Sequence, residues 1–341
     1  MNKKFVGFGE LLLRLTPEGY LRFRQASRFN LNYTGAEGNM CIALANMGMD
    51  AALVSKIPDN EIGQCALDML ERYGVNTEHV PRGGERLGVY YLEKGASQRP
   101  SKIIYDRKYS SISQAEPSEF DWEKILQDAG WFHFTGITAA LSDNCAQMCL
   151  DACRCARSLG IKVSCDLNYR KNLWSTEKAR SVMIPLMEYV DVLFANEEDS
   201  GNVLNVHADD SNIEEGKLSI EGYSDLAFRL KERFGFERVC ISLRESLSAS
   251  DNNWSGLMYA DGKTYVSRKY PIHLVDRVGG GDSFASGMIY ALMNEYENQE
   301  AIEFAVAASC LKQTIEYDFN LASVDEVKAL MKGSGSGRVQ R

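Results

Sequence analysis

The stretch DRVGGGDSFASGMIYAL, residues Asp276–Leu292, places three consecutive glycines directly before an aspartate and an amphipathic helix. A helix N-terminus leaves backbone N–H groups unpaired and carries partial positive charge. Glycines allow a ligand to approach that backbone closely, so Gly279, Gly280 and Gly281 predict an anion-binding turn, with phosphate the usual ligand. Asp282 would repel a phosphate but is suited to remove a proton from an attacking hydroxyl. The structural alternative is a plain glycine-rich turn with Asp282 as the helix N-cap.

The bulk composition narrows the class of protein. A chain of 341 residues that is 45% hydrophobic and 25% charged is ordinary for a globular protein, and it can form one large α/β domain with an appendage or two domains. The net charge of −9 argues against nucleic acids and anionic membranes as partners, but not against a small anionic ligand. The N-terminal residues lack the pattern of a signal peptide, and no apolar run reaches the length of a membrane span. We therefore expect a cytoplasmic protein.

The nine cysteines are an odd number in apolar contexts, which indicates reduced thiols. Cys145, Cys149, Cys153 and Cys155 form the tightest group. A metal site is conceivable there, but no histidine and no C-x-x-C pair accompanies them. Packing in the core is the favoured interpretation.

Strand-like and helical patterns alternate along most of the chain, which is typical of a parallel sheet covered by helices. The pattern changes between Arg86 and Tyr109, where β-branched and aromatic residues flank a turn in the manner of a hairpin. Residues 21–33 read similarly. We expect these two segments to form a small separate sheet that covers the C-terminal ends of the main strands.

The stretch D-x-x-G-x-G-D before a small-residue helix resembles the C-terminal signature of the PfkB/ribokinase family of sugar kinases. The resemblance implies that Asp282 is the catalytic base and that the amides of Gly279 to Gly281 form an anion hole. Arg277 stands where the family has threonine, and Gly280 where it often has alanine, but neither change removes the base or an amide donor. The N-terminal stretch YTGAEGNMCIALANMG resembles the family's glycine-rich element that binds sugar hydroxyls.

The resemblance covers nearly the whole chain and implies a fold. It implies a ribokinase-like three-layer α/β/α sandwich with a mainly parallel central sheet, formed by residues 1–332 as a single domain. A β-sheet lid would come from about residues 11–34 and 86–113, and residues 333–341 would be a flexible tail. The family resemblance also implies a homo-oligomer, dimer or higher, joined through the lid. An exposed small sheet with one apolar face favours such a partner on physical grounds.

Other stretches indicate the substrate class. RPSKIIYDR, WFHFTGITAALS and DLNYRKNLW resemble the branch of the family that phosphorylates 2-keto-3-deoxygluconate. A sugar acid needs a cation for its carboxylate, and arginine offers a planar two-donor group. Arg107 and Arg170 fall at strand ends or the loops after them, where α/β sites form, although a surface ion pair is the alternative for each. The resemblance implies substrate contacts from Gly35, Ala36, Gly38, Asn39, Tyr91, Tyr105, Arg107, Arg170, Asp282 and Asp318.

The resemblance also implies ATP and Mg²⁺ as cofactors. The run NEED, residues 196–199, resembles the N-x-x-E motif that organises Mg²⁺ and phosphate through water, with Asp199 in place of the usual glutamate. A solvated acidic loop is the alternative. The residues expected to face the nucleotide are Asn168, Asn196, Ser242, Arg244, Glu245, Ser246, Gly279 and Gly281.

The sequence therefore predicts an ATP-dependent sugar-acid kinase that converts 2-keto-3-deoxygluconate to 2-keto-3-deoxy-6-phosphogluconate, with Asp282 as general base. A neutral-sugar kinase of the same fold, acting on fructose or ribose, should be indifferent to losing Arg107 and Arg170. A catalytically silent sugar-acid-binding protein would have no use for the base. A dinucleotide-binding oxidoreductase is a poor match, because VGFGELLLRL lacks the third glycine of G-x-G-x-x-G. The sequence does not distinguish between the gluconate-derived and the galactonate-derived keto-deoxy acid as substrate.

Overall fold

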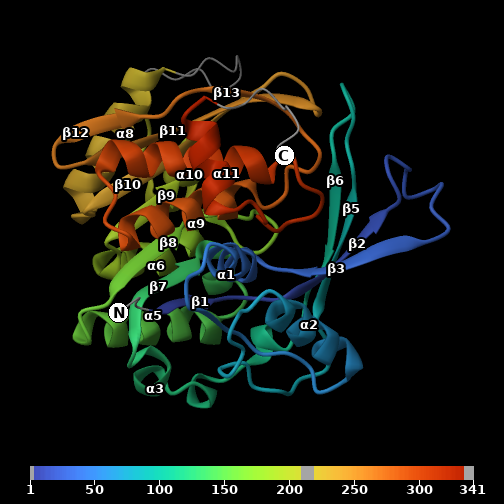
Figure 1. Ribbon diagram of the computed structural model, residues 1–341. Helices are drawn as coiled ribbons and strands as arrows, with labels where there is room; N and C mark the ends of the chain where they lie inside the picture. Colours follow the sequence, from blue (N-terminus) through green and yellow to red (C-terminus); the bar gives the residue numbers. More distant parts are fainter. Residues whose placement is uncertain (1–3, 209–218, 334–341) are drawn as a thin grey trace.

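The chain folds around one large sheet, shown in Figure 1, in a computed structural model that describes residues 4–208 and 219–333. The strands of this sheet are β1 (Lys4–Phe8), β4 (Ala51–Val54), β7 (Ala129–Thr135), β8 (Lys162–Asp166), β9 (Val192–Ala195), β10 (Arg238–Ser246), β11 (Asp251–Ala260), β12 (Lys263–Val266) and β13 (Tyr270–His273). Their order is β12-β11-β10-β9-β8-β7-β1-β4, with β13 paired to β11. The strands from β10 to β4 are parallel, and β11 is antiparallel to its three neighbours. The predicted mainly parallel sheet is confirmed.

Two hydrophobic cores lie on the two faces of this sheet. Successive residues of a strand point to opposite faces, so Phe5 belongs to one core and Val6 to the other. One core is covered by α1 (Ala36–Asn46), α2 (Glu61–Arg72), α9 (Gly280–Met293), α10 (Asn298–Lys312) and α11 (Val324–Met331). The other is covered by α3 (Trp122–Leu126), α5 (Asp143–Ser158), α6 (Thr176–Leu186) and α8 (Ile220–Phe234). The expected three-layer sandwich is confirmed.

Short elements complete the connections: α4 (Gly136–Ala140), α7 (Glu197–Asp199), the 3₁₀ helices η1 (Ile112–Gln114), η2 (Pro117–Glu119) and η3 (Met187–Tyr189), and the π-helix η4 (Ser200–Leu204). Local chemistry sets several helix starts. The side chain of Asn60 accepts a hydrogen bond from the Gly63 amide at the start of α2. The Ser142 side chain accepts one from the Cys145 amide at the start of α5. On α5, Cys149 and Cys153 are buried in the core. No helix of residues 4–208 and 219–333 is long and apolar enough to cross a membrane.

A second, smaller sheet stands beside the main body (Figure 1). Its order is β3 (Phe29–Thr34), β2 (Leu12–Pro17), β5 (Gly88–Glu93) and β6 (Lys102–Asp106). This confirms the small separate sheet expected from the two β segments. The tail expected at residues 333–341 lies, after Gly333, outside the described residues.

A buried ion network fastens this small sheet to the rest of the molecule. Arg14 on β2 is fully buried, and its guanidinium donates to Asp276 Oδ2 at 2.6 Å and to Asp318 Oδ2 at 2.7 Å. The Tyr90 hydroxyl on β5 donates to the other Asp318 oxygen at 2.8 Å. The Lys312 ammonium, also buried, donates to the Asp276 carbonyl at 3.1 Å. Two strands of the small sheet are thus tied to the turns before α9 and after α10.

We expect Arg14→Leu to lower the free energy of unfolding by about 3–5 kcal/mol, because it removes the guanidinium that hydrogen-bonds to both buried carboxylates. Arg28→Leu is the matched control, because the Arg28–Glu18 ion pair of the same sheet is exposed and should contribute little. Urea unfolding followed by circular dichroism checks both variants. Small and equal effects of the two substitutions would contradict this role for Arg14.

Candidate active site

The glycine-rich turn has the geometry of an anion-binding helix start. Gly279 has φ of +80°, and a side chain there would place Cβ 2.1 Å from the Asp318 carbonyl oxygen, so this position requires glycine. The Gly280 amide donates a long hydrogen bond of 3.4 Å to the Arg277 carbonyl. The amides of Gly279 and Gly281 make no hydrogen bond to any other described residue, and nothing lies within 4 Å of a Cβ built on Gly281. Two of the three predicted amides are therefore free for a ligand.

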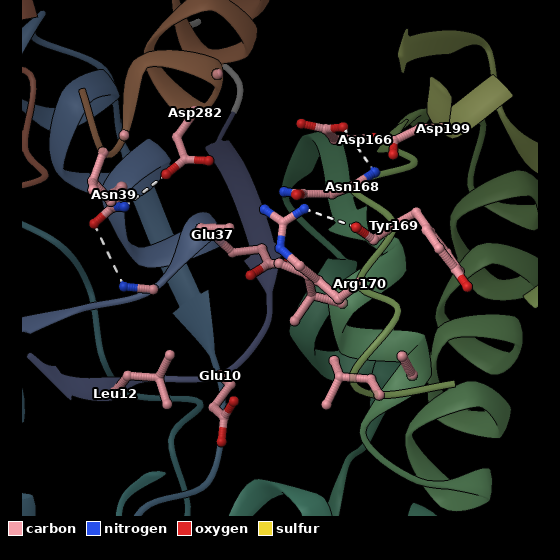
Figure 2. A pocket seen from close by; sticks show the side chains of 18 of the residues that line it. Glu10, Leu12, Glu37, Asn39, Asp166, Asn168, Tyr169, Arg170, Asp199 and Asp282 are labelled. Atoms are coloured by element: carbon pink, nitrogen blue, oxygen red, sulfur yellow. Dashed lines mark hydrogen bonds between the residues drawn. The ribbon is translucent and has the colours of Figure 1, made fainter. Parts of the chain in front are cut away.

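Asp282 stands in the first turn of α9 at the wall of a large cavity of about 1460 Å³. Its Oδ2 accepts a hydrogen bond of 2.7 Å from Asn39 Nδ2 (Figure 2). Asn39 Oδ1 in turn accepts one of 2.8 Å from the Thr34 hydroxyl. Desolvation raises the pKa of Asp282 to about 6, although the Asn39 hydrogen bond opposes that rise. The carboxylate is thus oriented, ionised at neutral pH and more basic than an exposed aspartate.

Most residues predicted for the site line this single cavity. The structure brings together Gly35, Ala36, Asn39, Tyr105, Arg107, Asn168, Arg170, Asn196, Asp199, Ser242, Arg244, Gly279, Gly280, Gly281, Asp282 and Asp318. They come from both sheets and from the starts of α1 and α9, so the cavity lies between the small sheet and the C-terminal ends of the main strands. Gly35 also needs to be glycine, because its Cβ would lie 2.0 Å from the Glu10 carbonyl oxygen.

Four predicted residues are not among those that line the cavity. Tyr91 lies on the outer face of the small sheet against Phe29, and its neighbour Tyr90 faces the cavity instead, because side chains alternate along a strand. Gly38 packs inside the protein, where an added Cβ would meet the side chains of Leu11 and Leu70. The remaining two belong to the end of β10: Glu245 is bonded to Asn253 and Lys269, and Ser246 is exposed.

The two arginines predicted to hold a carboxylate have different surroundings. Arg107 donates from Nε at 2.8 Å and from Nη2 to Glu10 Oε2, and the pair is buried at the cavity wall. The Arg170 guanidinium makes one hydrogen bond with the described residues, from Nη1 to the Tyr169 carbonyl at 2.9 Å. Figure 2 shows its guanidinium pointing toward the carboxylates of Asp166 and Asp282. Arg170 therefore has more hydrogen-bond donors available for a ligand than Arg107.

An acidic group lines the cavity at the ends of neighbouring strands. Desolvation, together with the charges of Asp199 and Asp282, raises the pKa of Asp166 to about 8. Desolvation raises the pKa of Asp199 to about 6, and the Arg170 charge opposes that rise. The side chain of Asn196 fixes this acid by accepting from its amide at 2.7 Å and donating to its Oδ2 at 2.9 Å. These carboxylates are poorly compensated, and a bound cation would stabilise their ionised forms.

Sequence reasoning did not assign the cavity residues Glu10, Glu37, Tyr90, Asp166 and Arg277 to the site. Asp166 ends β8, and polar residues at the carboxyl ends of parallel strands are the signal that could have found it. Glu37 is buried and accepts hydrogen bonds from the Thr135 amide and the Thr138 hydroxyl, a contact that joins segments far apart in the sequence. Burial raises its pKa to about 7.

Comparison with known proteins now identifies the family. Residues 3–316 match the model of the pfkB family of carbohydrate kinases. The chain belongs to the PfkB family of carbohydrate kinases. Among curated proteins, a 2-dehydro-3-deoxygalactonokinase of Haloferax volcanii is 31% identical over 337 residues, which is 99% of each chain. A 2-dehydro-3-deoxygluconokinase of Thermoproteus tenax is 26% identical over 332 residues, covering 96% of this chain and 94% of its own.

A solved structure is also similar to this PfkB-family kinase. The 2-dehydro-3-deoxygluconokinase of Thermotoga maritima is 47% identical, with a TM-score of 0.94, over 97% of this chain and 100% of its own. The resemblance inferred from the glycine-rich turn is therefore confirmed at the level of family and fold. The chain is a kinase, and the individual roles of its cavity residues belong to the proposal below.

Proposed function

We propose that this kinase transfers the γ-phosphoryl group of ATP to the terminal primary hydroxyl of 2-keto-3-deoxygluconate, also called 2-dehydro-3-deoxygluconate, and forms its 6-phosphate. The observation that carries the proposal is the position of Asp282. This carboxylate stands at a glycine-rich helix start, in the same cavity as Arg107 and Arg170. A base, an anion-binding turn and two carboxylate-binding cations in one cavity are what a sugar-acid kinase requires.

In this proposal, Asp282 removes the proton of the sugar hydroxyl as the new oxygen–phosphorus bond forms and the bond to the oxygen of ADP breaks. The Asn39 hydrogen bond keeps the carboxylate in one orientation. The free amides of Gly279 and Gly281 stabilise negative charge on the transferring group. We also propose that the small sheet acts as a lid that excludes water, so that the sugar and not water is phosphorylated.

We assign the substrate carboxylate to Arg170 and Arg107. Arg170 has donors left over after its single bond to a described carbonyl oxygen. Arg107 uses Nε and Nη2 for Glu10, and its Nη1 makes no hydrogen bond to any other described residue. The Glu10 pair would hold the Arg107 guanidinium in place while Nη1 binds the substrate. The names of the relatives support a sugar acid over a neutral sugar.

The cavity residues fit ATP with Mg²⁺. When bound, Mg²⁺ neutralises charge on the phosphates of the donor. Asp166 and Asp199, whose raised pKa values indicate uncompensated charge, would hold this ion, with Asp199 acting through water. No group of three or more His, Cys, Asp or Glu in residues 4–208 and 219–333 is arranged as a complete metal site. The phosphates would therefore supply part of the coordination. Asn168, Asn196 and Ser242 would line the nucleotide side.

We further propose that two copies of the chain associate through the outer face of the small sheet. This face presents Leu31 and Ile104, which are 56% and 55% exposed, beside Phe29 and Tyr91. Apolar residues gathered on one face favour a partner. Light scattering should give the mass of a dimer or larger oligomer for the wild type and a lower mass for Leu31→Asp. A wild-type mass of one chain at micromolar concentration would contradict this.

The substrate assignment is tested by ADP release from Mg-ATP with 2-keto-3-deoxygluconate, its galacto epimer, gluconate, fructose and ribose. We expect turnover to be confined to the keto-deoxy acids. Arg170→Gln and Arg107→Gln should each raise KM for the acid by about tenfold or more, because a charge-assisted hydrogen bond contributes about 1.5–3 kcal/mol. Strong turnover of fructose or ribose would overturn the assignment. Unchanged KM in both variants would show that the carboxylate binds elsewhere.

A further inference from the structure

Two arginines at one side of the cavity stand apart from its other cations. Arg244 lies near the end of β10, where it pairs in register with Trp254 of β11. Arg277 lies in the turn between β13 and α9, two residues before Gly279. Both line the cavity, and neither guanidinium group makes a hydrogen bond or ion pair with any other residue in the described parts of the chain. They are unpaired guanidinium groups beside the anion-binding turn.

The two groups are close enough to act on each other. Desolvation and the charge of Arg277 lower the pKa of Arg244 below its ordinary value, and desolvation lowers that of Arg277. Two like charges without a counter-ion repel each other, although water screens this repulsion at Arg244, which is exposed in the cavity. In contrast, Arg14 is paired with two aspartates and Arg107 with Glu10. Because no carboxylate of the described residues pairs with Arg244 or Arg277, we infer that a bound ligand supplies the anion.

The position of Arg277 relates the pair to the glycine-rich turn. The cations with the largest effect on Asp282 are Arg170 and Lys312. Arg244 comes from β10, which lies four strands away from β1 in the order of the main sheet. Arg277 directly precedes the glycine-rich turn and also lines a small pocket with Leu92 and Lys94, at the edge of the small sheet. Its closeness to the glycine-rich turn points to a phosphate as the ligand of the pair.

We propose that Arg277 and Arg244 together bind the β- and γ-phosphates of the nucleotide, next to the free amides of Gly279 and Gly281. This inference rests on the proposed function. The guanidinium group suits this task, because it can donate two parallel hydrogen bonds to one phosphate. The pair would also offset the charge of the acids on the strand ends, Asp166 and Asp199 among them, which would otherwise repel a triphosphate. Arg277 is thus a nucleotide-binding residue of this chain at a position where the family signature has threonine.

Calorimetric titration with Mg²⁺ and a non-hydrolysable ATP analogue, and separately with adenosine, tests the pair. Arg277→Gln and Arg244→Gln should each weaken binding of the analogue about tenfold or more, with adenosine binding and the KM for the sugar acid unchanged. Arg277→Lys should restore part of the affinity, because it returns the charge without the planar group. Arg154→Gln, an exposed arginine on α5, is the matched control and should bind the analogue as the wild type does.

Unchanged affinity for the analogue in both glutamine variants would overturn the proposal. A rise in the sugar-acid KM alone would also overturn it and would assign the pair to the carboxylate. An equal loss of adenosine and analogue binding would indicate a disturbed fold and contradict a phosphate-specific role. If the wild type fails to turn over any sugar acid while analogue binding still depends on both arginines, the proposed substrate falls and the phosphate site stands.

Discussion

The buried guanidinium of Arg14 is the contact on which the geometry of the cavity depends. It joins a strand of the small sheet to Asp276, before the glycine-rich turn, and to Asp318, whose carbonyl oxygen abuts Gly279. With Tyr90 and Lys312 it forms a network in which two cations balance two carboxylates inside the protein. The relative position of the small sheet and α9 is therefore set by ionic and hydrogen-bonded contacts, in addition to apolar packing.

Outside this balanced network, the cavity is rich in charges that lack partners. Carboxylates with raised pKa values occupy the strand ends, while Arg244 and Arg277 stand unpaired beside the glycine-rich turn. Such an arrangement costs stability in the free protein and is resolved when ligands supply the opposite charges. A sugar acid, a divalent cation and a nucleotide phosphate would each satisfy one part of the cavity.

Features that depend on neighbours in the sequence could be predicted, whereas contacts between distant residues could not. The alternation of strands and helices gave the three layers, and the turn at Gly279 with Asp282 gave the family, because these depend on neighbours in sequence. Tyr91, predicted to contact the substrate, is not among the residues that line the cavity, whereas Tyr90 is. Which side of a strand faces the cavity depends on the register of that strand in the sheet. The Arg107–Glu10 pair and the Arg14 network join residues separated by about a hundred positions or more, so no local pattern reveals them.

The central claim is that Asp282 is the base, and the most direct measurement is the rate of Asp282→Asn against pH beside the wild type. Wild-type kcat/KM should fall as the pH drops below about 6, because the carboxyl group is then protonated and cannot accept the proton. The asparagine variant should lose about 10²–10⁴-fold in kcat while retaining nucleotide binding, and it should lack that acid limb. A variant that keeps its rate, or that keeps the same acid limb, would contradict the account.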